Sequence, residues 1–79
     1  MPRCRCDAVD QRIGKNIRYH RERRGLSLEA LGEGAGVSFE QIRKYENGTN
    51  RIAASRLARV AETLQVQISA FFQEQSSNN

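Results

Sequence analysis

An aromatic ring, a carboxylate and two cations lie within six residues of one another, at Phe39, Glu40, Arg43 and Lys44. These side chains suit the base edges in the major groove of DNA. Arginine or lysine donates to guanine O6 and N7, glutamate accepts from cytosine N4, and an aromatic ring packs on the thymine methyl group. The four positions share the outward face of a helix whose other face buries Ile42. We therefore predict that these four residues read bases. The alternatives are that Phe39 tucks between this helix and the one before it, and that Arg43 and Lys44 belong to a solvated face.

Two short helices are expected to position this surface, one from Leu28 to about Ala35 and one from Phe39 to about Asn47. A tight turn at Gly36 joins them. Gly32 falls inside the first of these helices, where it costs up to about 1 kcal/mol relative to alanine, so the following helix must approach its backbone closely. Two helices crossed in this way form a helix-turn-helix, whose second helix, 38–47, enters the major groove of duplex DNA.

Serine caps define where both helices begin. Ser27 precedes the first helix and Ser38 the second, and Ser38 with Gln41 forms a capping box in which each side chain satisfies a backbone N–H. Two apolar pairs can fix the entry angles of the helices: Leu26 with Leu31, and Val37 with Ile42.

The remaining elements are also helical. Residues 10–24 place Ile13 and Ile17 at helical spacing, with Asp10 as the N-cap and Gly25 after the last turn. Residues 54–64 carry one apolar stripe: Leu57, Val60, Ala61 and Leu64. A short fifth element holds Ile68, Phe71 and Phe72, which is more apolar surface than a small monomer is expected to cover.

The 79 residues are enough for one domain. An apolar fraction of 38% with five aromatic residues and no Trp favours helices over a β-sandwich. The expected fold is all-α, a compact bundle of five short helices spanning residues 10–73, with flexible tails at 1–9 and 74–79. No apolar run approaches 18 residues and no signal peptide is recognisable, so we expect a cytoplasmic protein without a membrane span.

Positive charge is concentrated at one end of the chain. The net charge is +4, and 11 of the 13 basic residues are arginine, which binds phosphate with two parallel hydrogen bonds. Residues 1–24 hold eight basic and three acidic groups, residues 25–50 two and four, and residues 51–79 three and two. This distribution suits an anionic partner, although a solvated basic helix would look similar.

Phosphate contacts are expected around the two helices. The candidates are Ser27, Ser38, Asn47, Thr49, Asn50 and Arg51, with Arg18 as a weaker one. The turn at residues 47–50 can bring backbone N–H groups and the Asn50 side chain near a phosphate, although it can also be a simple loop. Ser27 and Ser38 act first as caps, whether or not they also touch DNA.

No catalytic, metal or cofactor site is predicted. The one histidine, His20, lies in an arginine-rich helix and is expected to be a half-buried filler. Cys4 and Cys6 are too few for a four-ligand zinc site within one chain and are expected to be free thiols in the N-terminal tail. A redox role, or a metal held across a dimer, is the alternative for these cysteines.

Many residues between Ile13 and Leu64 follow the spacing of one known family. They are Ile13-Gly14, Ile17-Arg18, Arg21, Arg24-Gly25-Leu26-Ser27, Leu31-Gly32-Glu33, Gly36-Val37-Ser38, Tyr45-Glu46-Asn47-Gly48, Leu57, Val60-Ala61 and Leu64. From residue 13 to residue 72 the chain resembles the Xre/Cro-like helix-turn-helix transcriptional regulators, the group that includes the phage lambda repressors. Residues 37–39, 44–52 and 54–57 resemble a bacterial subgroup that is common in alphaproteobacteria.

The resemblance implies two contacts. The family keeps alanine or glycine at the position of Gly32, so that the recognition helix can cross closely. It also pairs an arginine of the first helix with the glutamate that ends the third, here Arg21 and Glu46. An exposed pair of this kind would contribute less than about 1 kcal/mol.

The chain departs from the family pattern at four positions. Glu40 and Arg43 stand where the subgroup usually has glutamine, so the base-reading surface is altered. Ala53 and Gln65 stand where most members have a polar cap before the fourth helix and a glycine after it.

The function expected from these observations is sequence-specific binding of double-stranded DNA by a transcriptional regulator that is not an enzyme. The small size favours a repressor. A dimer is expected, because one such domain reads only a few base pairs; Ile68, Phe71 and Phe72 are the predicted interface, unless the phenylalanines close the core of a monomer. The alternatives are an antitoxin, which would also bind a toxin protein, and a restriction-modification controller of the same fold.

Overall fold

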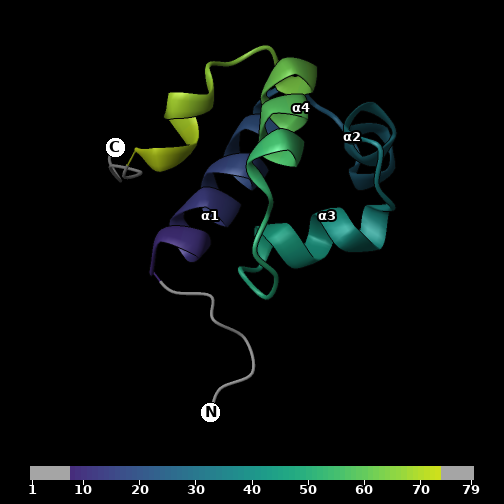
Figure 1. Cartoon of the computed structure of the whole chain (residues 1–79). Helices are drawn as coiled ribbons and strands as arrows, with labels where there is room; N and C mark the ends of the chain where they lie inside the picture. The colour runs from purple at the N-terminus through teal and green to yellow at the C-terminus, as the bar shows by residue number, and fades with distance from the viewer. Residues whose placement is uncertain (1–7, 74–79) are drawn as a thin grey trace.

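The computed structural model describes residues 8–73, which form four α-helices followed by a short 3-10 helix (Figure 1). In chain order the elements are α1 (Ala8–Arg23), α2 (Leu28–Ala35), α3 (Phe39–Glu46), α4 (Ala54–Leu64) and η1 (Ile68–Phe72). There is no strand between residues 8 and 73, so the prediction of an all-α fold is confirmed.

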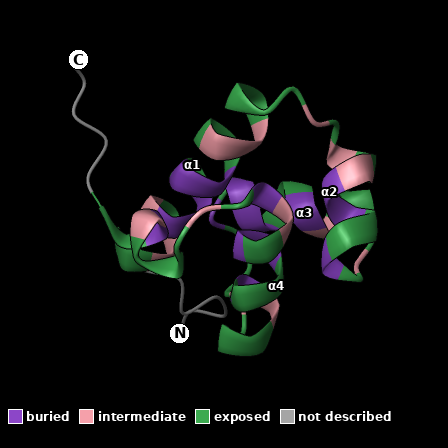
Figure 2. Cartoon of the chain, turned by 90° about the horizontal axis from the view of Figure 1, so that it is seen from above, coloured by how far each residue is buried: buried purple, intermediate pink, exposed green. Residues whose placement is uncertain are grey.

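Every element contributes to a single core, which Figure 2 shows as the buried faces of helices turned toward one another. The buried apolar residues are Ile13, Ile17, Leu31, Ala35, Ile42, Tyr45, Leu57, Val60, Ala61, Leu64 and Phe71. The predicted apolar stripe of α4 accounts for four of them. Leu26 and Val37, the residues predicted to fix the entry angles of the two helices, are partly buried against this core.

The first helix begins earlier than predicted. It begins at Ala8, so Asp10 lies in the first turn and is not the N-cap. The Asp10 carboxylate instead forms an ion pair with Arg51, 3.2 Å away in the chain that leads to α4. In the first turn the Asp10 carboxylate still interacts favourably with the helix dipole, so α1 loses little stability although Asp10 does not cap it. Gly25 follows the helix with φ of +70°, as its position predicted.

The predicted fifth helix is a 3-10 helix of five residues, so the bundle has four α-helices and not five. Its hydrogen bonds are of the shorter i to i+3 type, with the Ala70 N–H donating to the Gln67 carbonyl at 2.9 Å. The last carbonyls find a partner outside the element. The buried Asn16 side chain of α1 donates to the Phe71 and Gln73 carbonyls, each at 2.7 Å, and so attaches η1 to α1.

The two departures from the family pattern at the ends of α4 are visible in the structure. Ala53 precedes the helix without a side-chain hydrogen bond, and Gln65 ends it in the left-handed conformation at φ of +59°. The family's usual serine and glycine are the residues that favour these two positions. The N–H groups of Gln65 and Val66 still close the C-terminal end by donating to the Glu62 and Ala61 carbonyls, and the buried apolar stripe of α4 packs the helix on the core.

Candidate nucleic-acid interface

The turn between α2 and α3 sets how closely the two helices approach. Gly36 adopts φ of +80°, and the N–H groups of Gly36 and Val37 both donate to the Gly32 carbonyl, at 2.8 and 2.9 Å. A Cβ on Gly32 would lie only 2.6 Å from the Val37 carbonyl oxygen. Any side chain there would push the start of α3 away from α2, so the close approach predicted at Gly32 is confirmed.

Both serine caps form as predicted, but only half of the predicted capping box does, because the Gln41 side chain does not bond to the Ser38 N–H. The Ser27 hydroxyl accepts a hydrogen bond from the Ala30 N–H at 3.0 Å, and the Ser38 hydroxyl accepts one from the Gln41 N–H at 3.1 Å. Each hydroxyl oxygen is thus held at the N-terminus of its helix, where the peptide dipoles favour an anion. Whether either serine contacts a phosphate stays a prediction.

The four predicted base-reading residues lie on the outward face of α3. Glu40, Arg43 and Lys44 are exposed, and Phe39 is 36% exposed. The structure brings two of them together, because the Arg43 guanidinium carbon lies 5.7 Å from the centre of the Phe39 ring. Ile42 and Tyr45 on the opposite face are buried in the core, which fixes the orientation of the exposed face.

The loop after α3 differs from the expectation in one respect. The N–H of Gly48 donates to the Tyr45 carbonyl, and the N–H groups of Thr49 and Asn50 donate to the Lys44 carbonyl. These amides donate to the last carbonyl groups of α3. The prediction that they are available to a phosphate is therefore wrong. The exposed side chains of the loop remain candidates for such contacts.

Two arginines considered for phosphate binding have partners within the protein. Arg51 holds Asp10 while its side chain stays 56% exposed. Arg18 pairs with Glu22 one turn along α1 at 3.0 Å, with both side chains more than half exposed. The Arg51–Asp10 pair was not predicted, since the two residues are 41 positions apart and Asp10 also has the features of an N-cap.

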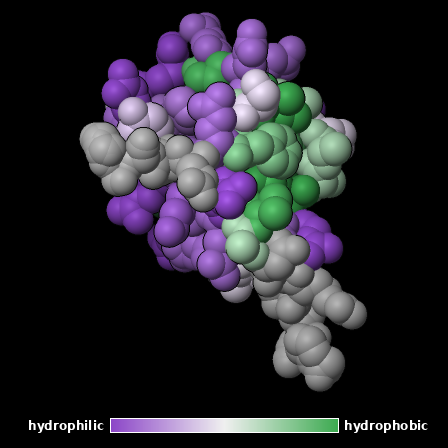
Figure 3. Space-filling view, turned by 90° about the vertical axis from the view of Figure 1, so that its left-hand side faces the viewer, coloured by the Kyte–Doolittle hydropathy of each residue, from purple (hydrophilic) through white to green (hydrophobic). Residues whose placement is uncertain are grey.

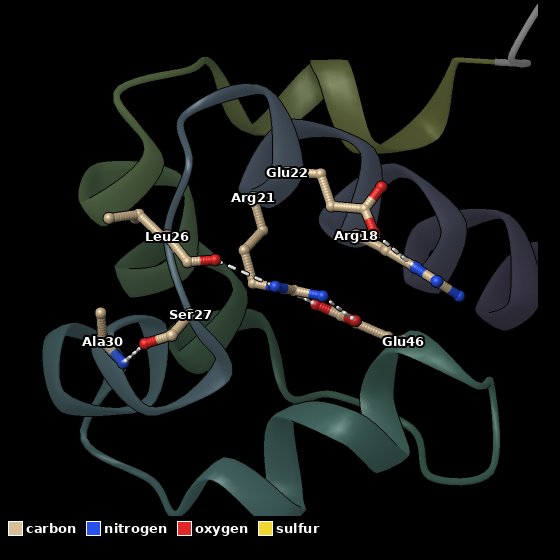
Figure 4. A network of polar contacts seen from close by, with 7 residues as sticks. All are labelled: Arg18, Arg21, Glu22, Leu26, Ser27, Ala30 and Glu46. Carbon is tan, nitrogen blue, oxygen red and sulfur yellow. Dashed lines mark hydrogen bonds and ion pairs between the residues drawn. The ribbon is translucent and has the colours of Figure 1, made fainter.

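A charged network connects α1, the start of α2 and the end of α3 (Figure 4). Arg21 donates to Glu46 through two nitrogens, Nε at 2.6 Å and Nη2 at 3.1 Å, and its Nη1 donates to the Leu26 carbonyl at 2.9 Å. The side chains are only 13% and 5% exposed. The hydrogen bond to Glu46 raises the pKa of Arg21 above its ordinary value. The pair implied by the family resemblance is confirmed, and it is buried.

Close packing accompanies this network. Gly14 of α1 lies against the end of α3, and a Cβ there would collide with the Tyr45 carbonyl oxygen. The α1 and α3 backbones therefore touch where Arg21 and Glu46 join the two helices. This arrangement fixes the direction of α3 from its C-terminal end, while the Gly36 turn fixes it from the N-terminal end.

The three residues of the predicted dimer interface divide between core and surface. Phe71 is fully buried inside the single chain, which matches the alternative that it closes the monomer core. Ile68 and Phe72 are 40% and 45% exposed. η1 lies at the end of the molecule opposite α2 in both Figure 1 and Figure 2, so these two side chains are remote from the reading residues at the start of α3.

His20 is half-buried against Phe71, as expected of a filler. The two rings meet edge to face, with centres 6.0 Å apart. Burial lowers the pKa of His20 below its ordinary 6.5, and the positive charge of Arg23 lowers it further.

The unfolded chain binds this proton more readily than the folded chain, so the free energy of unfolding should fall as the pH drops below about 6.5. Replacing His20 by glutamine should make stability depend less on pH between 7 and 5. Urea unfolding of both proteins at the two pH values tests this, since contributions from other groups cancel in the difference. Equal losses in the two proteins would contradict the assignment.

Two further features are absent between residues 8 and 73: a cluster of metal ligands and a membrane-spanning helix. In this part of the chain no three His, Cys, Asp or Glu side chains gather where they could hold a metal ion. None of its helices is long and apolar enough to cross a membrane. Cys4 and Cys6 lie outside the described residues, so their predicted role is untested.

Two crossed helices with an exposed, charged second helix define a helix-turn-helix domain. The chain belongs to the helix-turn-helix family HTH_3, whose model matches residues 17–71, and with it to the Xre/Cro-like transcriptional regulators. It is 47% identical over 66 residues to an uncharacterized HTH-type transcriptional regulator of Sinorhizobium medicae, covering 84% of this chain and 48% of that protein. The chain thus spans about half the length of this relative. Further relatives come from Rhizobium and Rickettsia, which confirms the predicted alphaproteobacterial subgroup.

Solved structures of lower sequence identity share the fold. The restriction-modification controller protein C.AhdI from Aeromonas hydrophila superposes with a TM-score of 0.79 at 23% identity, over 84% of this chain and 100% of that one. The P22 c2 repressor, whose structure was solved with a synthetic operator, gives a TM-score of 0.72 at 24% identity, over 77% of this chain and 92% of that one. The lambda repressor-like architecture implied by the sequence is therefore confirmed.

Proposed function

We propose that this domain binds duplex DNA sequence-specifically and represses transcription, with α3 inserted in the major groove. The observation that carries the proposal is the outward face of α3, where an aromatic ring, a carboxylate and two cations are exposed. Such a set has no role in the core. It supplies the donor, acceptor and apolar groups that distinguish base pairs in the major groove.

The ion pairs of the domain support this assignment. Arg21, Arg18 and Arg51 each hold a carboxylate. Within residues 8–73 Arg43 and Lys44 form no ion pair, although Glu40 lies on the same helix. A cation that needs no internal partner keeps its donors available for a ligand.

Phosphate contacts would set the register of the domain on the duplex without selecting sequence. Ser27 and Ser38 at the two helix starts are proposed for this role. Proposed with them are the side chains of the loop after α3: Asn47, Thr49, Asn50 and Arg51. All six residues are exposed. Their contribution should appear as salt-dependent affinity for DNA of any sequence.

Selection of binding sites from a random duplex pool tests the function directly. The purified protein is incubated with the pool at near-physiological salt, and a low-salt sample measures non-specific affinity. We expect one sequence to be enriched. Salt-sensitive binding without enrichment would contradict sequence-specific reading by this chain alone and favour the antitoxin alternative, in which a partner protein is needed. Absence of binding at either salt would overturn the proposal.

Arg43→Ala should weaken binding to the enriched site about 10-fold or more, because a bidentate contact to guanine contributes about 1–3 kcal/mol of discrimination. Non-specific affinity at low salt should change far less. Arg23→Ala is the matched control, since it removes the same charge from an exposed position on α1. Fluorescence anisotropy with the enriched duplex and a scrambled one gives both affinities. An equal loss on the two duplexes would contradict base reading by Arg43.

Repression would follow from occupancy, because a domain seated in the groove of a promoter excludes other proteins from that DNA. A reporter gene with the enriched site overlapping its promoter should lose expression when the protein is present. The same reporter with a scrambled site is the control. Increased expression would indicate an activator.

We further propose that the domain binds DNA as a two-fold dimer through η1. Figure 3 shows apolar side chains gathered on the side of the molecule where η1 lies, bordered by hydrophilic surface. Ile68 and Phe72 are the large exposed apolar residues of η1. A second copy is a suitable partner for this patch, because its position opposite α2 would leave both recognition helices free to face DNA.

Phe72→Arg should shift the protein from dimer to monomer in sedimentation equilibrium and reduce affinity for the complete site. Tyr19→Arg is the control, since Tyr19 is a similarly exposed aromatic residue on α1. If η1 forms the interface, the enriched site should be an inverted repeat with half-sites about 10 base pairs apart, close to 34 Å. A wild-type monomer on a single half-site would contradict the dimer without affecting the proposed DNA binding.

A further inference from the structure

The contact between Phe39 and Arg43 goes beyond a list of exposed residues. Phe39 is the first residue of α3, directly after the Ser38 cap, and Arg43 follows one turn later. The Arg43 guanidinium carbon lies 5.7 Å from the Phe39 ring centre, within the range of a cation–π interaction. The two side chains therefore form one unit, which we call the Phe39–Arg43 pair.

The environment of Phe39 shows that the ring is not part of the core. Phe39 is 36% exposed and is absent from the partly buried side chains that pack on the core: Leu26, Leu28, Val37, Ile52 and Val66. Its main chain is fixed by the Ser38 cap and by the close approach of α3 to α2 at Gly32. The ring thus lies outside the core, at the start of α3, with part of its surface exposed.

The environment of Arg43 complements that of the ring. Some arginines spend their donors inside the protein: Arg21 on Glu46 and Leu26, and Arg56 on the Ala35 carbonyl at 2.7 Å. Across residues 8–73 Arg43 donates to no carboxylate or carbonyl. The contact places the guanidinium beside the Phe39 ring and uses none of its N–H groups. The forked edge of Arg43 is therefore positioned in advance and still free to bind.

The separation within the pair is on the scale of neighbouring base pairs in DNA. Base pairs follow one another every 3.4 Å or so along the duplex, so a separation of 5.7 Å is less than two steps. A ring edge that touches a methyl group at C5 of a pyrimidine would bring the fork of Arg43 to O6 and N7 of a guanine in the neighbouring pair. The methyl group would pack in the space beside the ring and the guanidinium.

We infer that the Phe39–Arg43 pair recognises a two-base-pair step, in which a pyrimidine carrying a 5-methyl group is next to a guanine. Phe39 selects the methyl group and also positions Arg43, whose fork selects the guanine. Thymine is the ordinary pyrimidine of this kind, and 5-methylcytosine presents its methyl group at the same atom. This inference rests on the proposed DNA binding and specifies which DNA the domain selects.

Single-atom changes in the enriched duplex test the inference. Replacing each thymine in turn by uracil removes only the methyl group, and replacing each guanine by 7-deazaguanine removes only the N7 acceptor. For the unaltered protein we expect one thymine whose replacement weakens binding about fourfold, the cost of one lost apolar methyl contact. The guanine whose replacement weakens binding most should lie in an adjacent base pair, with a loss of about 10-fold.

Three variants separate the two roles of Phe39. In Phe39→Ala the uracil substitution should have no effect and the 7-deazaguanine effect should shrink, because both the methyl contact and the support of Arg43 are gone. Phe39→Leu retains an apolar contact, so the uracil effect should persist in part while the 7-deazaguanine effect still shrinks. Tyr19→Ala is the control, since Arg23 lies over the Tyr19 ring at 5.4 Å, one turn along α1, although it also donates to the Tyr19 hydroxyl; this variant should leave both effects unchanged.

A further duplex tests the chemistry of the methyl group. With cytosine in place of the identified thymine, adding a 5-methyl group should restore about fourfold affinity in the unaltered protein and none in Phe39→Ala. Circular dichroism confirms that each variant is folded.

Two outcomes would overturn the inference while leaving the proposed function intact. In the first, the critical thymine and guanine are not in neighbouring pairs. In the second, the uracil effect is the same in Phe39→Ala as in the unaltered protein. If the random pool yields no enriched site, the proposed sequence-specific function fails, and the inference fails with it.

Discussion

Replacing Glu46 by alanine should lower the free energy of unfolding by about 3 kcal/mol, at the lower end of the range for a broken buried ion pair. The substitution leaves Arg21, whose side chain is only 13% exposed, without its carboxylate. The remaining hydrogen bond to the Leu26 carbonyl cannot neutralise that charge. The loss is large for a small domain with a total stability of about 5–15 kcal/mol.

Urea unfolding followed by circular dichroism measures this change as a lower midpoint with an unchanged slope. Glu22→Ala is the control. It breaks the exposed Arg18–Glu22 pair within α1 and should lower the free energy of unfolding by less than about 0.5 kcal/mol. Replacing Arg21 by methionine together with Glu46→Leu should recover much of the stability, since no unpaired charge remains. Equal costs for Glu46→Ala and Glu22→Ala would contradict the buried network.

Phe71→Ala should lower the free energy of unfolding by about 3–5 kcal/mol. Phe71 is fully buried, and its ring packs edge to face on His20. Truncation would leave a cavity between α1 and η1 at the position where Asn16 also attaches the two elements. The variant should be close to unfolding at room temperature.

The neighbouring residue provides the control for this prediction. Phe72 is 45% exposed, so Phe72→Ala should change monomer stability by no more than about 0.5 kcal/mol. The comparison is made by urea unfolding at a protein concentration low enough for the monomer to dominate, since dimer formation would add its own stability. If Phe72→Ala lowered the free energy of unfolding more than Phe71→Ala, Phe72 and not Phe71 would be the core residue.

Local signals in the chain predicted most of the helix boundaries correctly. Ser27 and Ser38 marked the starts of α2 and α3 because a hydroxyl that caps a helix acts within three residues. Gly25 and Gly36 marked turns because a positive φ costs a residue with a side chain more than it costs glycine. Gly32 predicted a close crossing because glycine destabilises a helix interior. It is expected there only where a neighbouring segment leaves no room for a side chain.

Two errors occurred where the partner of a residue lies far away in the sequence. Asp10 has the features of an N-cap, yet it lies in the first turn of α1 and binds Arg51, 41 positions away. Residues 68–72 have helical apolar spacing, yet Asn16 satisfies the carbonyl of Phe71 and the segment ends as a 3-10 helix. Sequence spacing carries no information about such distant partners. A third error was local: the amides of residues 48–50 were expected to remain available, but they donate to the Tyr45 and Lys44 carbonyls and close the end of α3.

The amino-acid sequence specified the helices, the turn at Gly36 and the types of side chain on the outer face of α3, because caps, glycines and apolar periodicity act over a few residues. The tertiary structure decided what depends on contact between elements. It buried Arg21 with Glu46, placed Phe71 in the core while Phe72 stayed outside, and gave Arg51 and Arg56 partners on other elements. It also left the donors of Arg43 without a carboxylate partner within residues 8–73, because folding determines which charges meet. The contact of Arg43 with Phe39 is local, since the two residues lie one turn apart on α3.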